Sequence, residues 1–299
     1  MKALVTGATG LVGRELCQRL EQPAVLTRNA SPVGTSLGGG ARAFAWQPES
    51  ELAPTAAFEG VEAVFHLAGE PVAEGRWTPE KKQRIRNSRV LGTRNLVGRL
   101  ATLPALPRVL VCASAVGYYG TRGDEPLPEG APPGQGFLAD VCQEWEEEAR
   151  LAERYGVRVV LARLGLVLAP NGGALARMLP PFKLGVGGKL GDGRQWMPWV
   201  HLSDVVGLLL HAARDERLRG PMNVVGPEPV TNAELTRALG HVLGRPTVFA
   251  VPRLALRVAF GELSEVLFAS QRVIAQVASE THYTFRYRTL SPALEACLR

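Results

Sequence analysis

The chain has 299 residues, of which 46% are hydrophobic and 21% charged, and its formal net charge at pH 7 is +6. This composition excludes a disordered chain, and the length suffices for one large domain and a smaller one. The positive excess is spread thinly and is mostly arginine, so we expect no nucleic-acid partner, whereas an anionic small ligand such as a dinucleotide suits it.

No apolar stretch approaches the roughly 20 residues that cross a bilayer, and the N-terminus lacks the layout of a signal peptide. We therefore expect a cytoplasmic protein with no membrane partner. The four cysteines are scattered, form no CxxC pair, and are expected to be reduced packing residues: Cys17, Cys112, Cys142 and Cys297. No metal site is predicted.

Strands and helices alternate along the first half of the chain. Apolar runs predict strands over residues 2–6, 24–28, 62–69, 108–114 and 157–165. Helical periodicity lies between them, over residues 11–22, 78–103 and 137–156. Thr78 is a suitable N-cap for the second helix, with Pro79 at its first position. The alternation predicts an α/β fold, a parallel sheet with helices on both faces.

The second half of the chain is richer in glycine and proline, which predicts loops around smaller elements. Two amphipathic helices are expected over residues 201–215 and 231–244, with Ser203 and Thr231 as their N-caps. The last 50 residues are expected to be helical, with one short aromatic strand over 282–287. The glycine-rich stretch 35–43 is interpreted as a surface loop.

The stretch VTGATGLVGRE places three glycines between the first predicted strand and the first predicted helix. Gly7 permits a tight turn, Gly10 lets the backbone approach a pyrophosphate, and Gly13 lets the helix pack on the strand. The N–H groups at the helix N-terminus then face the anion. The pattern predicts a dinucleotide site, and the alternative is a structural turn on a fold that has lost its ligand.

The end of the second predicted strand indicates which dinucleotide binds. A ribose 2′-hydroxyl usually meets an Asp or Glu there, whereas a 2′-phosphate is accommodated by an arginine. Here the strand ends with Thr27 and Arg28, and no acid follows. The sequence therefore predicts NADP(H) as the cofactor, with a solvated surface arginine as the alternative interpretation of Arg28.

Motifs along nearly the whole chain resemble the extended branch of the short-chain dehydrogenase/reductase superfamily, the nucleotide-sugar epimerase-like proteins. They are VTGATGLVG, HLAG, LGTRNL, SAVGYYG, WVHLSDVV and GPMNVVG. Five further motifs resemble, more narrowly, an epimerase-like subfamily of unsettled function with a short C-terminal domain. They are HLAGEP, GYYG, RLGLVLAPNGG, MLPPFKLGVGGKLGDGRQ and GELSEVL. The resemblance implies a Rossmann-type doubly wound sheet with the active site at the carboxyl ends of its strands.

The resemblance also implies a division of the chain. We expect an NADP-binding Rossmann domain over residues 1–166, to which the chain returns around 199–226, and a smaller, mainly helical C-terminal substrate or lid region over 167–299. The expected cofactor-binding residues are Gly7, Thr9, Gly10, Leu11, Val12, Gly13, Thr27, Arg28, Leu67, Ala68, Gly69, Arg89, Ala113 and Leu166. A homodimer is expected by analogy, through helices around Trp145.

The usual acid–base pair of the superfamily has no counterpart in this sequence. Hydride transfer there relies on a tyrosine whose pKa is lowered by a lysine four residues on, because a phenol is otherwise a poor base near neutrality. No tyrosine here has such a lysine. Aligned through the following acidic run, Gly136 and Asp140 stand at the two positions, which argues against the usual mechanism.

The remaining catalytic candidates are Ser114, Tyr118, Tyr119 and Glu70. Ser114 lies where the family's catalytic serine lies, and its alternative role is to cap the next turn. A phenol of the two tyrosines can donate a proton, or the rings can pack or stack on a ligand. Glu70 follows the cofactor-lining strand and is a candidate base or ribose ligand.

Several other polar residues are interpreted as structural. His201 and Asp204 are expected to support the fold at the start of a helix. The acidic run EWEEEAR, residues 144–150, is interpreted as a solvated helix face. Arg89, at a position where the family commonly has asparagine, is expected either to reach the cofactor or to lie on the helix surface.

Two functions are open. The first is an NADP(H)-dependent oxidoreductase or epimerase-like enzyme that acts on a small carbonyl or sugar-nucleotide-like substrate. The second is a catalytically inactive NADP(H)-binding sensor or regulatory protein that signals through loop closure to a partner. The two share the cofactor site and differ only in the acid–base machinery.

Overall fold

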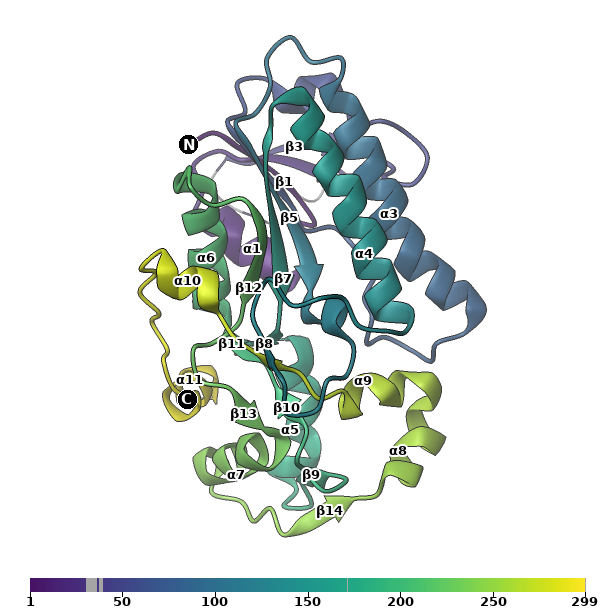
Figure 1. The fold of residues 1–299 in the computed structure, drawn as a ribbon, viewed down its shortest axis with the longest axis vertical. Coiled ribbons are helices and arrows are strands. Elements are labelled where there is room, and N and C mark those ends of the chain that lie inside the picture. The colour runs from purple at the N-terminus through teal and green to yellow at the C-terminus, as the bar shows by residue number, and fades with distance from the viewer. Residues whose placement is uncertain (31–36, 38–39, 171, 299) are drawn as a thin grey trace.

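The computed structural model describes residues 1–30, 37, 40–170 and 172–298. At its centre is a seven-stranded parallel sheet in the order β12-β7-β5-β4-β1-β2-β3 (Figure 1). Its strands are β1 (Ala3–Thr6), β2 (Ala24–Thr27), β3 (Arg42–Ala45), β4 (Ala63–His66), β5 (Val109–Ala115), β7 (Arg158–Leu164) and β12 (Gly220–Val224). The strand order reverses between β1 and β4, which is where ligands bind in open sheets of this kind.

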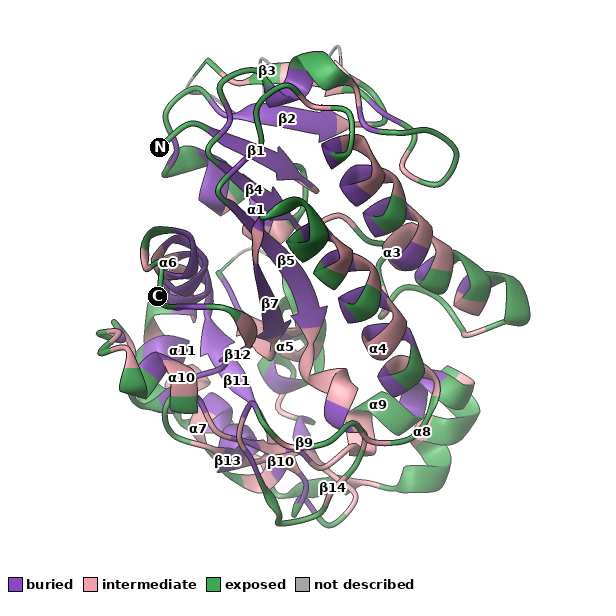
Figure 2. Ribbon diagram, turned by 45° about the horizontal axis from the view of Figure 1, so that its top comes forward, coloured by how far each residue is buried: buried purple, intermediate pink, exposed green. Residues whose placement is uncertain are grey.

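Helices cover both faces of this sheet. On one side lie α1 (Leu11–Gln18) and α6 (Leu202–Arg214), and on the other α3 (Pro79–Leu100) and α4 (Phe137–Arg150) (Figures 1 and 2). Alternate residues of the central strands supply two separate cores, as in β5, where Val111 joins the α6 side and Leu110 the α3 side. Burial on both faces explains why the strands are continuous apolar runs.

The second half of the chain forms smaller elements at the carboxyl edge of the sheet. Its helices are α5 (Gly173–Lys183), α7 (Asn232–Leu243), α8 (Arg253–Phe260), α9 (Ser264–Phe268), α10 (Gln276–Glu280) and α11 (Leu290–Leu298). Its strands are β8 (Leu166–Leu168), β9 (Gly188–Leu190), β10 (Trp196–Met197), β11 (Trp199–His201), β13 (Val230–Thr231), β14 (Phe249–Val251) and β15 (Arg272–Val273). They pair as β8 with β11, β9 with β14, β10 with β13, and β15 with β6 (Pro126–Leu127).

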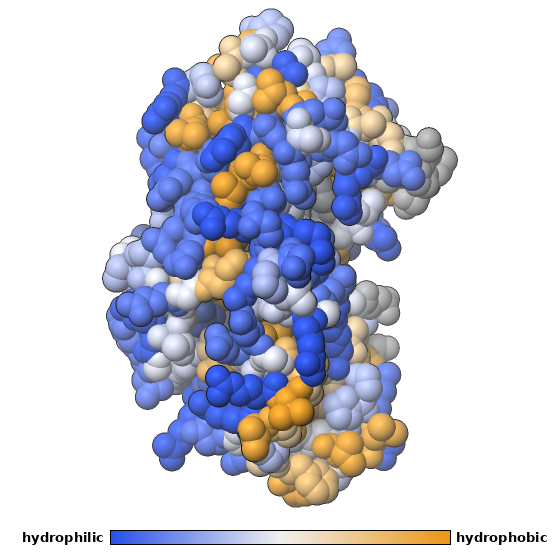
Figure 3. Space-filling view, turned by 90° about the vertical axis from the view of Figure 1, so that its right-hand side faces the viewer, coloured by the Kyte–Doolittle hydropathy of each residue, from blue (hydrophilic) through white to orange (hydrophobic). Residues whose placement is uncertain are grey.

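Apolar side chains gather on the surface of this second half. Seven of them are exposed around α8, β14 and the end of α5: Leu184, Val186, Val248, Phe249, Leu254, Val258 and Phe260. Figure 3 shows apolar surface at the lower end of the face it presents. None of the residues of α8 is buried, so this helix contributes little to the core.

Two predicted helix starts are confirmed and one is wrong. The Thr78 hydroxyl accepts a hydrogen bond from the Lys81 N–H, and Thr231 forms a capping box with Glu234. Ser203 is not a cap. The residue before the helix is His201, whose Nδ1 accepts from the Ser203 N–H at 3.1 Å, so the imidazole does what a hydroxyl was expected to do.

The predicted aromatic strand over residues 282–287 is also wrong. The N–H groups of Arg286 and Tyr287 donate to the Asp204 carboxylate, at 2.8 and 3.0 Å, instead of pairing with another strand. Asp204 is 1% exposed, and it therefore ties the C-terminal segment to the start of α6. Its expected structural role is confirmed by these contacts.

The predicted loop over residues 35–43 lies partly outside the described residues. Its last two residues, Arg42 and Ala43, belong to β3, which pairs with β2 in parallel. The four cysteines are free and buried. Among the described residues, no helix has the length and apolarity to cross a membrane, and no three His, Cys, Asp or Glu side chains are grouped to hold a metal.

Candidate functional site

The turn between β1 and α1 requires glycine for steric reasons. Gly7 has a φ of +70°, and a Cβ added there would lie 2.7 Å from the backbone carbon and oxygen of Leu67. At Gly13 a Cβ would lie 2.3 Å from the Gly7 carbonyl oxygen. Both contacts are shorter than atoms tolerate, so the glycines let β1, β4 and α1 approach closely.

The N-terminus of α1 presents free backbone donors. The Gly10 N–H donates to the Gly7 carbonyl at 3.0 Å, and Gly10, the N-cap, offers no side chain. Within the described chain, the N–H groups of Leu11, Val12 and Gly13 have no hydrogen-bond acceptor. Unsatisfied N–H groups at a helix N-terminus form a site for an anion such as a pyrophosphate.

A cavity of about 410 Å³ opens beside this turn, at the carboxyl ends of β1, β2, β3 and β4. Eight of the predicted cofactor-binding residues line it: Gly7, Thr9, Gly10, Thr27, Arg28, Leu67, Ala68 and Gly69. Glu70 lines it as well. The other six, which are not in its lining, are Leu11, Val12, Gly13, Arg89, Ala113 and Leu166.

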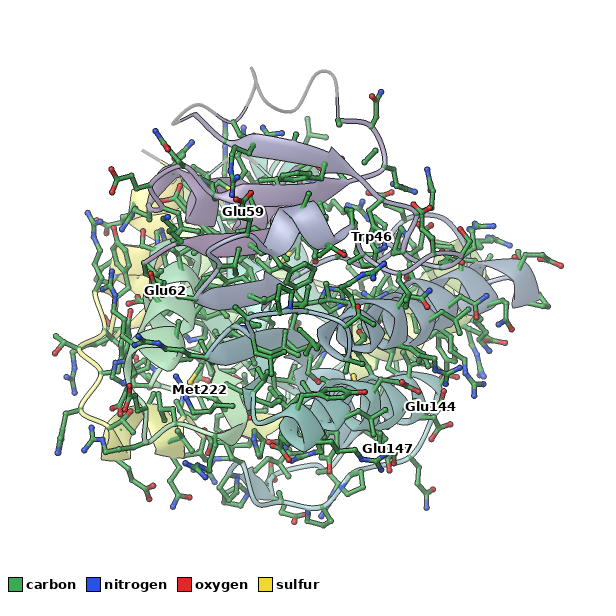
Figure 4. All side chains as sticks on the ribbon, turned by 90° about the horizontal axis from the view of Figure 1, so that it is seen from above. Trp46, Glu59, Glu62, Glu144, Glu147 and Met222 are labelled. Atoms are coloured by element: carbon green, nitrogen blue, oxygen red, sulfur yellow. The ribbon has the colours of Figure 1, made fainter. Side chains whose placement is uncertain are left out.

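One wall of the cavity was not predicted from the sequence. It consists of the residues after β3: Trp46, Gln47, Pro48, Glu49 and Ser50. The Trp46 indole N–H donates to the Glu51 carbonyl at 2.9 Å, and the Trp46 ring is buried in the core on the α3 side of the sheet (Figure 4). The alternation of Phe44 and Trp46 with small residues was the available signal for a strand ending here.

Arg28 lies at the end of β2, where it is exposed and lines the cavity. In the part of the chain that the structure describes, its guanidinium has no hydrogen bond or ion pair. A free guanidinium beside an anion site suits a second phosphate, because its N–H groups match phosphate oxygens in pairs. The site therefore fits a dinucleotide with a 2′-phosphate.

Glu70 is held by α3. Lys81 Nζ lies 2.7 Å from Glu70 Oε1, and Arg84 Nε lies 3.6 Å from the same oxygen. The hydrogen bond from Lys81 lowers the pKa of Glu70, and the charge of Arg84 adds to the effect. Glu70 is thus a paired carboxylate at the edge of the cavity.

Arg89 lies under the loop that follows β4. Its guanidinium donates to the carbonyls of Glu70 and Ile85 at 3.0 and 3.1 Å and lies over the ring of Trp145. A Cβ at Gly69 would lie 3.1 Å from the guanidinium carbon. Burial lowers the pKa of Arg89. Arg89 therefore supports the cavity wall from behind.

Ser114 belongs to a buried ionic network. Its hydroxyl donates to Glu146 Oε1 at 2.7 Å, and Arg163 binds both oxygens of Glu146 at 2.8 and 2.9 Å. All three residues are at most 4% exposed. The expected solvated face of residues 144–150 is therefore wrong at Glu146, because this position of α4 faces Arg163 of β7 and two buried charges stabilise each other.

The two tyrosines differ in how their hydroxyls are used. The Tyr119 hydroxyl donates to Asn223 Oδ1 at 2.7 Å and accepts from Arg163 at 2.9 Å. Burial raises the pKa of Tyr119. The ring of Tyr118 lies on the Arg163 guanidinium, and within the described residues its hydroxyl has no hydrogen-bond partner. Among the four catalytic candidates, Tyr118 alone has an uncommitted polar group.

The positions aligned with the usual tyrosine and lysine lie at the N-terminus of α4. Gly136 is its N-cap, with a φ of +107°, and the Asp140 N–H donates to the Gly136 carbonyl at 3.0 Å. The carboxyl of Asp140 lies in the first turn, where a negative charge is favourable. The geometry of these two residues is that of a helix start.

A parallel sheet with this strand order and a glycine turn between β1 and α1 defines a dinucleotide-binding protein of the Rossmann type. The chain belongs to the NAD dependent epimerase/dehydratase family, whose model matches residues 3–226. Residues 251–297 match a domain of unknown function, DUF1731. The predicted family and fold class are confirmed.

Similar proteins extend over nearly the whole chain. Epimerase family protein Mb2239 of Mycobacterium bovis is 40% identical over 97% of this chain and 95% of its own. An SDR39U1 homolog of Arabidopsis thaliana, described as chloroplastic, is 40% identical over 100% of this chain and 87% of its own. The crystal structure of human SDR39U1 with NADPH matches with a TM-score of 0.88, 30% identity and 99% coverage of both chains. The predicted cofactor, NADP(H), agrees with these findings.

Proposed function

We propose that this protein binds NADP(H) in the cavity beside Gly7 and acts as an oxidoreductase or epimerase-like enzyme on a small carbonyl or sugar-nucleotide-like substrate. The observation that carries the proposal is the glycine turn, which opens a helix with free N–H groups and lines the same cavity as the unpaired guanidinium of Arg28. The human relative crystallised with NADPH supports the choice of cofactor. Bound NADP(H) supplies hydride transfer.

Different residues of this chain would bind different parts of the cofactor. The N–H groups of Leu11, Val12 and Gly13 would hold the pyrophosphate, and Arg28 the 2′-phosphate. The adenosine would lie between the segment after β3 and the segment after β4, both of which line the cavity. Trp46 belongs to the first of these walls and Gly69 to the second.

We assign proton transfer to Tyr118. Its hydroxyl is free to bond a ligand, whereas the hydroxyls of Ser114 and Tyr119 and the carboxylate of Glu70 already have partners. Ser114 and Tyr119 then act as positioning residues, since both bond to the Glu146–Arg163 pair on which the Tyr118 ring rests.

The second candidate, a catalytically inactive NADP(H) sensor, is favoured by a different observation. Three of the four catalytic candidates are engaged in hydrogen bonds within the fold, as expected of residues in an active site that has lost its catalytic activity. A sensor would signal through closure of the C-terminal region, which already contacts the segment between β4 and α3: Arg177 of α5 donates to the Ala73 carbonyl, and Arg76 donates to the Val258 carbonyl of α8.

Cofactor binding and turnover are measured separately to test the proposal. Titration with NADPH and NADH should show saturable binding with a preference for NADPH. Steady-state oxidation of NADPH against a panel of carbonyl compounds and sugar nucleotides should then show turnover. NADPH binding without turnover across the panel supports the sensor, and absence of binding to either cofactor overturns both functions.

Three further expectations accompany this function. We still predict that residues 167–299 form a substrate or lid region, that the protein is a homodimer, and that it is cytoplasmic. The helix expected at the dimer interface is α4. Its Trp145 is 4% exposed and already packs inside the protein, so a pair of α4 helices would meet through the outer face of α4.

A further inference from the structure

A second cavity, of about 550 Å³, lies at the opposite edge of the sheet from the cofactor cavity. It is bounded by the starts of β4, β5 and β7, at Ala63, Val109 and Arg158. In Figure 4 Glu62, which lines it, and Trp46, which lines the cofactor cavity, lie toward opposite ends of the strands. We call it the amino-edge cavity, and the proposed function does not use it.

Basic side chains predominate around the amino-edge cavity. The charged residues that line it are Arg108, Arg158, Arg214, Arg219, Glu62 and Glu216. Four positive charges against two negative ones make the local field attractive to anions.

One of the four arginines is built into the fold. The Arg158 guanidinium donates to the carbonyls of Ala212, Ala213 and Leu218 at 2.9, 2.9 and 2.6 Å. These carbonyls lie at and just beyond the C-terminus of α6, where the helix dipole is negative. Arg158 therefore offsets the negative end of the α6 dipole, which would repel an anion at this place.

The other three arginines are exposed and uncommitted. Across the described residues, the side chains of Arg108, Arg214 and Arg219 have no hydrogen bond or ion pair. Asp215, the acid that follows Arg214 in the sequence, is paired with Arg217, with 2.6 Å between the two groups. Arginines of α3 behave differently, since Arg94 pairs with Glu148 of α4 at 2.6 Å. The amino-edge cavity therefore differs from the surface of α3 in that three of its guanidiniums have no ion pair.

Backbone donors at this edge are already used. The N–H of Arg108 donates to the Glu62 carbonyl, that of Arg158 to the Arg108 carbonyl, and that of Ala63 to the Lys2 carbonyl. Recognition must then come from side chains, and here these are guanidiniums. The planar guanidinium binds two phosphate oxygens at once, which makes phosphate the anion it recognises best.

We propose that the amino-edge cavity binds a small phosphorylated metabolite with at least two negative charges, separately from the cofactor. Its volume lies within the range of about 300–1,000 Å³ that small-molecule sites occupy. Glu62 and Glu216 offer acceptors for hydroxyl groups of such a ligand. The same two carboxylates disfavour a long uniform polyanion, which is why a small metabolite is favoured over a nucleic acid.

The experiment measures binding of inorganic pyrophosphate by calorimetry to protein that already holds excess NADPH, so that the cofactor site is filled. The test variant carries Arg108→Gln, Arg214→Gln and Arg219→Gln. Its affinity for pyrophosphate should fall at least about tenfold, because each lost charge-assisted contact is typically worth more than the 1.4 kcal/mol of a tenfold change.

The matched control removes the same charge elsewhere. Arg237→Gln, Arg245→Gln and Arg288→Gln change three exposed arginines outside both cavities, and this variant should bind pyrophosphate as the unaltered protein does. A third variant with lysine at the three cavity positions keeps the charge but loses the paired N–H geometry, so its affinity should be intermediate. The three cavity arginines have no partner, so all variants should fold, which thermal unfolding checks.

Four outcomes would overturn the proposal. They are a dissociation constant of the unaltered protein weaker than about 10 mM, equal affinity in the test variant, an equal loss in the control variant, and binding of a single-stranded oligonucleotide in place of pyrophosphate. None of these outcomes depends on catalytic turnover. Comparison of the two glutamine variants locates the site even in protein that binds NADPH weakly.

Discussion

The guanidinium carbon of Arg163 lies 3.5 Å from the centre of the Tyr118 ring. This contact joins a half-buried residue, Tyr118, to a buried one, because Arg163 is 2% exposed and bound to Glu146. The ion pair thus fixes the ring, and the ring presents a free hydroxyl.

Substitution Tyr118→Phe tests the assigned proton transfer. The ring and its contact with Arg163 are retained, and only the hydroxyl is lost. Turnover should fall about 10²–10⁴-fold, the usual contribution of a general acid or base, with NADPH affinity unchanged. Tyr155→Phe, at an exposed tyrosine, is the control. Full activity of the Tyr118 variant would remove this residue from the mechanism.

Substitution Arg28→Ala tests the choice of cofactor. Loss of a charge-assisted contact of about 1.5–3 kcal/mol should weaken NADPH binding roughly 10–100-fold, with NADH affinity unchanged. Arg19→Ala, which changes an exposed arginine of the region after α1 outside the cavity, should alter neither affinity. Equal effects of Arg28→Ala on both cofactors would contradict recognition of the 2′-phosphate.

Substitution Gly7→Ala separates close approach from backbone conformation. At Gly244, with a φ of +62° and nothing within 4 Å of an added Cβ, alanine should cost only the left-handed conformation, about 1–2 kcal/mol. At Gly7 the clash with Leu67 adds to the same conformational cost, so the loss of unfolding free energy should be larger by about 1–3 kcal/mol. Denaturant unfolding of the two variants measures the difference.

Substitution Glu146→Gln leaves Arg163 buried without its counter-charge. The unfolding free energy should fall by about 3–5 kcal/mol, the usual cost of breaking a buried pair. The neighbouring Glu147 is exposed, so Glu147→Gln should be close to neutral. Figure 4 shows Glu147 on α4 in the layer outside the sheet. Equal stability of the two variants would show that the pair contributes little.

The buried imidazole of His66 predicts a pH dependence of stability. Burial lowers the pKa of His66 from 6.5 to about 3, where it bonds to the hydroxyls of Thr6 and Thr93. The folded protein keeps this ring neutral, whereas the unfolded chain binds a proton below pH 6.5. Its contribution to stability is therefore complete above pH 6.5 and is lost as the pH falls toward 3, by up to about 1.4 kcal/mol per pH unit.

This slope can be isolated with a variant. His66→Gln should flatten the decline of unfolding free energy between pH 6.5 and 4, whatever its effect on absolute stability. His241→Gln, at an exposed histidine, should keep the slope of the unaltered protein. An unchanged slope in the His66 variant would show that another group causes the acid sensitivity.

Much of the sheet and its helices was predictable because the signals are local. The strands buried on both faces are continuous apolar runs, and Thr78 and Thr231 cap the helices that follow them. The predicted strand at 282–287 failed because its alternating aromatic residues bury against Asp204 and α6 without a partner strand. Local alternation indicates which side chains are buried, and strand pairing depends on neighbours.

The cofactor turn was predictable for the same reason, and the rest of the site was not. Three glycines and Arg28 occupy positions within one βα unit and the next strand, so their spacing carries the geometry. The wall at Trp46 depends on β3 joining β2, which the sequence hardly signals. Whether the hydroxyl of a catalytic candidate is free depends on hydrogen bonds between residues far apart in the sequence, such as the bond from Tyr119 to Asn223.

By itself, the sequence determined the class of fold, the glycine turn and the arginine that accompanies it, because steric limits on the backbone and the period of apolar residues act over a few neighbours. Only the tertiary structure decided that Ser114 and Tyr119 are engaged, that Glu146 is buried, and that three unpaired arginines share one cavity. Those outcomes depend on which side chains meet after folding, since burial and ionic partners are properties of the packed molecule.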